Sequence, residues 1–291
     1  MSHVPVMAGE VLQLIEASTG QLLVDLTVGA GGHSRAFLDA TAPGGQVHAC
    51  DRDHEALSLA EVNLAAYPDR VEFHHGDSVE CLERLIKRGV QADAVLMDLG
   101  VSSMQLDEED RGFSLREDGP LDMRMNRTDE RTAADVVNRA SADELEVALR
   151  DLGGEPRARR IVEAIVERRK TRPFRSTGDL RDLVERALRR RGGRIHPATK
   201  TFQAIRMLVN RELELLERSL PLSLDVLRPG GYVAFLSFHS GEDRLVKYAF
   251  RELASEGKGE LVMRKGMTAS MAEQRSNRRS RSARLRVLRK L

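Results

Sequence analysis

The chain has 291 residues, of which 41% are hydrophobic, and its formal net charge is +1. This amount of apolar material is enough for one large core, so we expect a globular protein with one large domain or one domain that carries another. The near-zero net charge argues against a protein that simply coats nucleic acid, and the lack of a long uncharged apolar run argues against a membrane protein.

The N-terminus and the cysteines point to the cytoplasm. Residues 1–5 have neither the basic start nor the apolar run of a signal peptide, so we expect a cytoplasmic protein without a membrane partner. The chain has only two cysteines, Cys50 and Cys81, without CxxC spacing, and it shows no histidine cluster at the spacing of metal ligands. The sequence therefore predicts reduced core thiols, with no disulfide and no metal site.

Short apolar runs alternate with helix-like stretches in the first hundred residues, which predicts a parallel sheet flanked by helices. The fourth run ends in the carboxylate Asp98. The expected strands are 22–26, 46–50, 71–74 and 92–98, and the expected helices are 9–15, 33–40, 55–65 and 79–87.

A different pattern follows the fourth strand. Residues 107–126 are polar and rich in turn residues, which indicates a long active-site loop. Residues 132–191 have helical periodicity throughout, with predicted capping boxes that begin at Ser141 and Ser176. We expect a helical insertion that contributes contacts to a substrate.

The α/β pattern then resumes. It predicts a helix at 201–220, a strand at 232–237 after a proline-glycine turn, a helix at 243–253 and a last strand at 283–288. The basic C-terminal segment could instead be a disordered arm, but its alternation of apolar and polar residues favours a strand.

Arginine and lysine gather in three segments, at 157–175, 189–194 and 275–290. Solvated helix faces are one explanation of such segments. Three of them in one chain favour a polyanionic partner.

A strand that leads directly into a glycine turn is the strongest local signal. The turn contains Gly29, Gly31 and Gly32, and a helix begins at about His33. Glycines let a ligand approach the backbone, and the N–H groups at the start of the helix face that ligand. The next strand ends in Asp51, where a carboxylate can accept both ribose hydroxyls of an adenosine. These residues predict a nucleoside site.

A nicotinamide-dinucleotide site would have the same glycine turn and acidic residue, so the spacing of the glycines has to distinguish the two kinds of site. A GxGxxG motif that starts at Gly29 requires glycine at position 34, where the chain has Ser34. Asp98 at the end of the fourth strand, and the turn that enters the fifth, instead match an S-adenosylmethionine-dependent methyltransferase.

Several unusual strings carry a further resemblance: His3-Val4-Pro5-Val6, Gly29-Ala30-Gly31-Gly32-His33-Ser34, Asp51-Arg52-Asp53, Asp98-Leu99-Gly100-Val101-Ser102-Ser103, Arg111-Gly112-Phe113-Ser114, Gly119-Pro120-Leu121-Asp122-Met123-Arg124-Met125, His196-Pro197-Ala198-Thr199, Thr201-Phe202-Gln203-Ala204, Ser237-Phe238-His239-Ser240 and Arg281-Ser282-Ala283-Arg284-Leu285-Arg286-Val287. With these strings in this order, the chain resembles the bacterial MraW or RsmH family of ribosomal-RNA cytosine-N4 methyltransferases nearly from end to end.

The resemblance implies a class I S-adenosylmethionine-dependent methyltransferase fold, a Rossmann-like α/β sheet with an inserted all-helical domain. Residues 1–107 and 204–291 would form the methyltransferase domain, and 108–203 the active-site loop and an RNA-recognition insertion. The implied reaction methylates N4 of a cytidine in 16S rRNA near the decoding site. The implied partner is a small ribosomal subunit, assembled or late in assembly, with a homodimer as a further option.

Matching motifs also imply site residues. Ser78 stands where the family often has an aromatic residue, and Met104 stands where a proline often precedes Gln105, so the stacking of adenine is expected to differ here. The cofactor contacts carried over are Gly31, Gly32, His33, Asp51, Ser78, Asp98 and Gln105.

Methyl transfer to an exocyclic amine depends mainly on geometry, because the sulfonium leaving group is already activated. Asp98 is the candidate hydrogen-bond acceptor for the amine, and positioning alone can contribute roughly 7–11 kcal/mol. A base must be flipped out or single-stranded to react, and Phe238 is the candidate that stacks on it. His239 is a candidate to orient the base or a phosphate. Ordinary packing of Phe238 and a structural hydrogen bond of His239 remain alternatives.

Three rival functions remain open. The chain could methylate an amino group of DNA or of another RNA, it could bind a nucleoside without turnover, or it could bind NAD. Asp98 and the segment 107–126 argue against a module that only binds.

Overall fold

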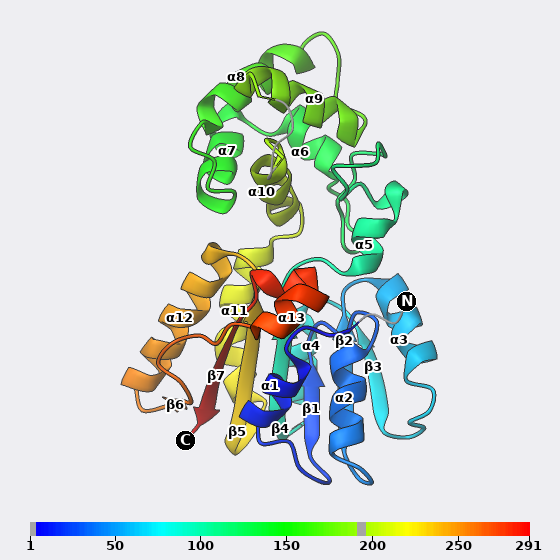
Figure 1. Ribbon diagram of the computed structural model, residues 1–291, viewed down its shortest axis with the longest axis vertical. Helices are drawn as coiled ribbons and strands as arrows, with labels where there is room; N and C mark the ends of the chain where they lie inside the picture. Colours follow the sequence, from blue (N-terminus) through cyan, green and yellow to red (C-terminus); the bar gives the residue numbers. More distant parts are fainter. Residues whose placement is uncertain (1–3, 191–195) are drawn as a thin grey trace. The chain divides into compact units, whose positions relative to one another are not determined.

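The computed structural model describes residues 4–190 and 196–291, and the chain divides into two units (Figure 1). Residues 1–100 and 213–291 form the first unit, and 101–212 form the second. His3 of the first family string, and Arg191 and Arg194 of the second basic segment, lie outside the described residues. The predicted boundaries at 107 and 204 both fall within the second unit, and its role in RNA recognition stays a prediction.

The first unit is built on a seven-stranded sheet with the order β3-β2-β1-β4-β5-β7-β6. The first five strands are parallel, and β7 runs antiparallel to both of its neighbours. The strand order reverses between β1 and β4, and in such sheets ligands bind outside the carboxyl ends of the strands at this point. The predicted Rossmann-like α/β class is confirmed. The strands are β1 (Leu22–Asp25), β2 (Gln46–Asp51), β3 (Val71–His75), β4 (Ala92–Asp98), β5 (Leu227–Ser237), β6 (Gly259–Leu261) and β7 (Arg284–Lys290).

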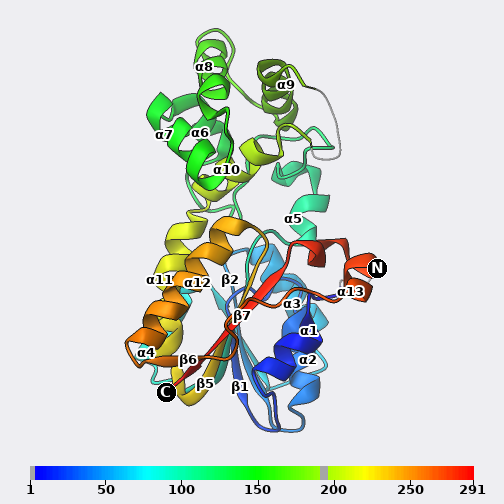
Figure 2. The same cartoon turned by 60° about the vertical axis from the view of Figure 1, so that its left-hand side comes forward.

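Helices cover both faces of this sheet because the strands carry apolar side chains on both faces. The cores place α1–α3 on one face and α4, α11 and α12 on the other, and Figure 2 shows these two groups on opposite sides. The helices are α1 (Ala8–Leu14), α2 (Gly32–Ala40), α3 (His54–Asn63), α4 (Ser78–Lys87), α11 (Glu212–Asp225), α12 (Ser240–Ser255) and α13 (Met271–Ser276), with a short 3-10 turn η3 (Arg278–Arg281).

The second unit is helical and has a hydrophobic core of its own. The predicted capping box at Ser176 is confirmed, and the Ser141 hydroxyl accepts a hydrogen bond from the Glu144 N–H. No helix in the described parts of the chain is long and apolar enough to cross a membrane. The elements of this unit are α5 (Ser103–Asp107), η1 (Glu109–Arg111), α6 (Ala133–Arg139), α7 (Ala142–Val147), the π-helical turn η2 (Ala148–Leu152), α8 (Ala158–Arg169), α9 (Thr177–Leu188) and α10 (Thr199–Val209).

The prediction of a single helix at 201–220 is wrong, because the helix is interrupted between α10 and α11. Arg211 has a φ of 51°, which a right-handed helix does not allow. Asn210 is fully buried and binds the preceding loop: its amide donates to the Met123 carbonyl, and its carbonyl accepts from the Met125 N–H. These tertiary hydrogen bonds end α10, and the apolar periodicity carries no sign of them.

The predicted C-terminal strand is confirmed as β7, so the alternative of a disordered arm is wrong. Leu285, Val287 and Leu288 are buried in the cores of the sheet. Arg286 pairs with Asp243 of α12 through two hydrogen bonds, at 2.7 and 3.1 Å. Part of the positive charge of the basic C-terminal segment is therefore paired within the fold.

The burial of β7 predicts the effect of a cavity. Leu285→Ala is expected to lower the free energy of unfolding by about 2–5 kcal/mol, because Leu285 has no exposed surface. Leu291→Ala, at a side chain that is 63% exposed, is the matched control and is expected to change it by less than about 0.5 kcal/mol. Urea unfolding followed by circular dichroism measures both, and equal stabilities of the two variants would contradict the packing of β7.

Candidate cofactor and active site

Asp25, at the end of β1, organises the glycine turn. It is 1% exposed, and its carboxylate accepts hydrogen bonds from the Thr27 N–H at 3.2 Å and from the Ser34 hydroxyl at 2.7 Å. Burial raises the pKa of Asp25, while the bonds from Ser34 and Thr27 oppose that rise. Asp25 is not among the site residues that the sequence predicts. A carboxylate that ends a strand, with a serine in the first turn of the next helix, is the signal that would have identified it.

Glycine is favoured in the turn for two different physical reasons, backbone conformation and packing. Gly29 and Gly31 have φ angles of 52° and 83°, which favour glycine. A Cβ at Gly31 would lie 3.1 Å from the Leu64 side chain, and one at Gly32 would lie 3.2 Å from Pro5. At these two positions a side chain would be tightly packed and would require its neighbour to move by a few tenths of an ångström. A Cβ at Gly29 would have more room, because its nearest neighbour is the Thr27 carbonyl oxygen at 3.9 Å.

Asp51, at the end of β2, accepts hydrogen bonds from two backbone N–H groups. The donors are Gly29 and Asp53, each at 2.9 Å. Burial raises the pKa of Asp51 to about 6, and the nearby Asp53 and Asp25 carboxylates add to the rise. A carboxylate offers about four acceptor positions, so the two backbone bonds leave room for two hydroxyl donors. The geometry of Asp51 is compatible with ribose binding, which stays a prediction.

Asp98, at the end of β4, faces His33. The Asp98 N–H donates to the Thr27 hydroxyl at 2.7 Å, and Asp98 Oδ2 lies 3.5 Å from His33 Nε2. Burial opposes protonation of His33, but the carboxylates of Asp98 and Asp25 outweigh it and raise the pKa of the imidazole. Among the described residues, Asp98 Oδ1 is buried and has no hydrogen-bond partner. This oxygen is an acceptor available to a ligand.

The strand register brings the three carboxylates to one edge of the sheet. Asp25 pairs with Ala49 on β2 and with Leu96 on β4. Asp51 and Asp98 each follow these partners by two residues, on the two strands that flank β1. Both therefore stand beside the turn that leaves β1, at the point where the strand order reverses.

Ser78 and Gln105 have protein partners. Ser78 is 6% exposed, and its hydroxyl shares a 2.7 Å hydrogen bond with the Ser219 hydroxyl of α11. Gln105 belongs to the second unit, where its side-chain oxygen accepts from the Ser102 N–H and its own N–H donates to the Ser102 hydroxyl. The first bond joins α4 to α11, and the other two cap α5. Cofactor contacts of Ser78 and Gln105 stay predictions.

Phe238 and His239 follow β5 at the same edge of the sheet. The Phe238 ring is partly buried against the core of the α1–α3 face, 3.6 Å from where a Cβ of Gly100 would stand. His239 caps α12: its Nδ1 accepts from the Gly241 and Glu242 N–H groups, and its Nε2 lies 3.0 Å from the buried Glu242 carboxylate. The structural hydrogen bond considered for His239 is thus observed, and contact of either residue with a base stays a prediction.

The arginines of the first basic segment divide into two groups. Arg168 pairs with Asp179 and lies over the Phe174 ring, and Arg169 donates to the carbonyls of Val137 and Ala140. These two arginines hold the helical core. Others, including Arg172 at 77% exposed, reach solvent.

Comparison with known proteins decides the family. The whole chain, residues 1–291, matches the MraW methylase family. The chain belongs to this family. It is 44% identical to the ribosomal RNA small subunit methyltransferase H of Syntrophotalea carbinolica, covering 99% of this chain and 98% of that protein. It is also 44% identical to the protein of that name in a Cyanothece species, covering 99% and 95%. A solved rRNA methylase from Streptococcus thermophilus superposes with a TM-score of 0.46 at 11% identity, covering 100% and 99%.

The predicted cofactor of this MraW-family chain, S-adenosylmethionine, is thereby confirmed, as is the methyltransferase class of the fold. The residues at the sheet edge fit it. Asp51 has acceptor capacity left for ribose hydroxyls, a Cβ at Gly29 would meet no atom closer than 3.9 Å, and Asp98 would offer a carboxylate to the positive sulfonium.

The raised pKa of Asp51 predicts that cofactor binding depends on pH. Protonation turns an acceptor oxygen into a donor, so the Kd for S-adenosylmethionine is expected to be constant above pH 7. It should rise by up to about tenfold per pH unit as the pH falls through about 6. Calorimetry from pH 5 to 8 measures this dependence.

Two variants provide the comparison. Asp51→Asn is expected to bind weakly with little dependence on pH, because the group that titrates is gone. Asp39→Asn, on the exposed side of α2, is expected to behave like the unmodified protein. A Kd that does not change between pH 5 and 8 in the unmodified protein would show that Asp51 does not bind the ribose as a carboxylate.

Proposed function

We propose that this chain transfers the methyl group of S-adenosylmethionine to the N4 amine of a cytidine in small-subunit ribosomal RNA, near the decoding site, in the cytoplasm. The names of its relatives support small-subunit rRNA as the substrate. The N4 atom and the decoding site follow from the family resemblance. The chemistry rests on Asp98 Oδ1, which is buried at the switch point of the sheet and has no hydrogen-bond partner in the part of the chain that the structure describes.

The mechanism assigns different tasks to the two oxygens of Asp98. Oδ2 faces His33, 3.5 Å from its Nε2, and the Asp98 carboxylate helps to raise the pKa of that imidazole. Oδ1 accepts a hydrogen bond from the N4 amine. This bond favours a pyramidal amine, whose nitrogen lone pair is no longer conjugated with the cytosine ring. The bound cofactor supplies an activated methyl group, and the amine can shed its proton after transfer. The hydrogen bond from the Asp98 N–H to Thr27 keeps this acceptor in place.

Phe238 is the proposed platform for the base. It follows the strand beside β4, and its ring lies over Gly100 in the segment that leaves Asp98. An enzyme that reacts with a base must hold it outside a helical stack, and an aromatic ring is suited to that task. His239 and Glu242, which cap α12 directly after Phe238, position this ring by fixing its backbone.

The helical unit is proposed to hold RNA phosphates. A hollow on its surface is lined by Arg172, Arg175 and Arg181 together with acidic residues. Arg172 and Arg175 are exposed, so their guanidinium groups can reach a phosphate. Such contacts supply affinity without sequence information, and the folded ribosomal substrate would then supply the specificity.

The reaction is tested by mass spectrometry of nucleosides from small subunits that lack the modification. We expect the chain to produce N4-methylcytidine from S-adenosylmethionine. Asp98→Ala should lower kcat by at least about 100-fold, because the acceptor for the N4 amine is lost, and it should also raise the Kd for the cofactor, because the carboxylate proposed to face the sulfonium is lost. Methylation of another atom, of DNA or of another RNA would contradict the proposed substrate. An Asp98→Ala enzyme with full kcat would contradict the role of Asp98.

Phosphate binding is tested by charge reversal at Arg172 and Arg175. Arg168 and Arg169 are unsuitable, because their substitution would also break the helical core. The Arg172→Glu, Arg175→Glu double variant is expected to bind RNA more weakly, with the slope of log K against log salt reduced by about one for each lost contact. Its affinity for S-adenosylmethionine should not change.

The matched control for this double variant is Arg150→Glu with Arg159→Glu, which reverses two exposed charges of the same unit that pair with Asp151 and Glu163. Equal RNA affinity and salt slope in the two double variants would contradict a specific phosphate contact at the hollow.

A further inference from the structure

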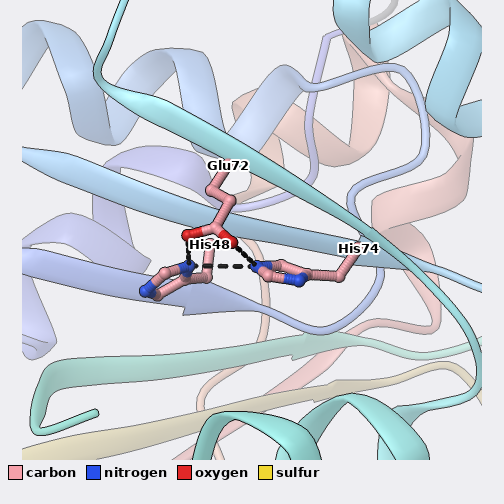
Figure 3. Close-up of side chains that lie close together, drawn as sticks. All are labelled: His48, Glu72 and His74. Atoms are coloured by element: carbon pink, nitrogen blue, oxygen red, sulfur yellow. Dashed lines mark hydrogen bonds and ion pairs between the residues drawn. The ribbon is translucent and has the colours of Figure 1, made fainter. Parts of the chain in front are cut away.

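We propose that His48, Glu72 and His74 form a binding site for a divalent transition-metal ion, with Zn²⁺ as the best fit. The three side chains converge on the face of the sheet, as Figure 3 shows. None of them takes part in the proposed methyl transfer. The sequence predicts no metal site, because the ligands come from two strands and have no recognisable spacing along the chain.

The strand register builds this cluster. His48 on β2 is the direct partner of Glu72 on β3, and His74 follows Glu72 by two residues. Partners in neighbouring strands and residues two apart on one strand share a face of a sheet. The three side chains therefore project from the same face. This is the face that α4 covers, because Cys50, the partner of His74, is buried there with Cys81.

The donor atoms already stand at distances that suit one ion. His48 Nδ1 lies 3.0 Å from His74 Nε2 and 3.3 Å from Glu72 Oε2, and His74 Nε2 lies 3.7 Å from Glu72 Oε1. Ligand atoms bound tetrahedrally to zinc at about 2.0–2.1 Å are about 3.4 Å from one another. Small movements of the side chains are thus enough to hold an ion, with a water molecule in the fourth position.

Burial and charge favour the metal-binding forms of the ligands. His74 is 5% and His48 12% exposed, and burial lowers the pKa of both imidazoles, that of His74 to about 4. Neutral imidazoles are the ligand form. Glu72 is 48% exposed and leaves the cluster open to solvent on one side, so an ion has a path of entry.

Arg88, directly after α4, fixes the carboxylate. Its guanidinium donates two hydrogen bonds to Glu72, at 2.6 and 2.9 Å, and lowers the pKa of that carboxyl. Glu72 is thereby held as a carboxylate that faces both imidazoles. Two imidazoles and one carboxylate favour Zn²⁺, Co²⁺, Ni²⁺ or Cu²⁺ over Mg²⁺ and Ca²⁺, which prefer sites made of oxygen alone. A bound ion would tie the edge strand β3 to β2.

The test uses the full chain without a polyhistidine tag, freed of metal with a chelator. Titration with Co²⁺ followed by absorption spectroscopy, and with Zn²⁺ followed by calorimetry, is expected to show one ion bound per chain and displacement of Co²⁺ by Zn²⁺. Zn²⁺ should raise the Tm of the protein. Mg²⁺ should neither displace Co²⁺ nor raise the Tm.

Substitutions assign the ion to the cluster. His48→Gln, His74→Gln and Glu72→Gln are each expected to weaken binding by at least about tenfold. Glu72→Gln keeps the test valid if the buried variants do not fold, because Glu72 is half exposed. His54→Gln, at an exposed histidine that begins α3, is the matched control and should bind like the unmodified protein.

The absence of saturable binding, or binding that Glu72→Gln leaves unchanged, would overturn the site. The affinity for S-adenosylmethionine, measured on the same samples, reports the methyl-transfer site separately, so failure of one proposal leaves the other standing.

Discussion

The fold and its chemistry depend on one electrostatic constraint: carboxylates must be held together at the end of a parallel sheet. Asp25 and Asp51 both have raised pKa values, because burial and neighbouring carboxylates disfavour their charge. Backbone N–H groups of Thr27, Gly29 and Asp53 partly offset this cost. The glycine turn is thus the structure that makes a cluster of acidic side chains tolerable. A ligand with a positive sulfonium and ribose hydroxyls would offset the remaining cost.

The two units separate the tasks of the protein. The α/β unit carries the acidic edge proposed to bind the cofactor and, on a different part of its sheet, the proposed metal cluster. The helical unit has its own core, and its arginines either support that core, as Arg168 and Arg169 do, or reach solvent. Even the segment expected to be a long active-site loop is anchored, since Leu121, Met123 and Met125 belong to the helical core. Contacts made by this unit are therefore built on a packed support.

The sequence was sufficient for features that depend on neighbours along the chain. The strands of the sheet are short apolar runs, and Asp51 and Asp98 end two of them, so both the sheet and its acidic edge could be predicted. Features that depend on tertiary contacts could not. The break at Asn210 depends on the Met123 carbonyl and the Met125 N–H, both more than eighty residues away, and the bond between Ser78 and Ser219 joins two helices.

His239 and the metal cluster show the same limit in different ways. His239 was predicted as a contact for the base or a phosphate, but a histidine that caps a helix has the same sequence environment. The cluster of His48, Glu72 and His74 depends on the register between two strands, which periodicity alone does not define. In each case the missing information was the position of a partner in space.

The most direct test of the account is the titration of the Asp51 carboxyl carbon by ¹³C NMR, with Asp51→Asn to assign the signal. In the free protein the account predicts a pKa of about 6, and with S-adenosylmethionine bound it predicts a pKa lower by at least about one unit, because ribose hydroxyls stabilise the carboxylate. A pKa that is the same with and without the cofactor would contradict the central claim that this carboxylate holds the adenosyl group.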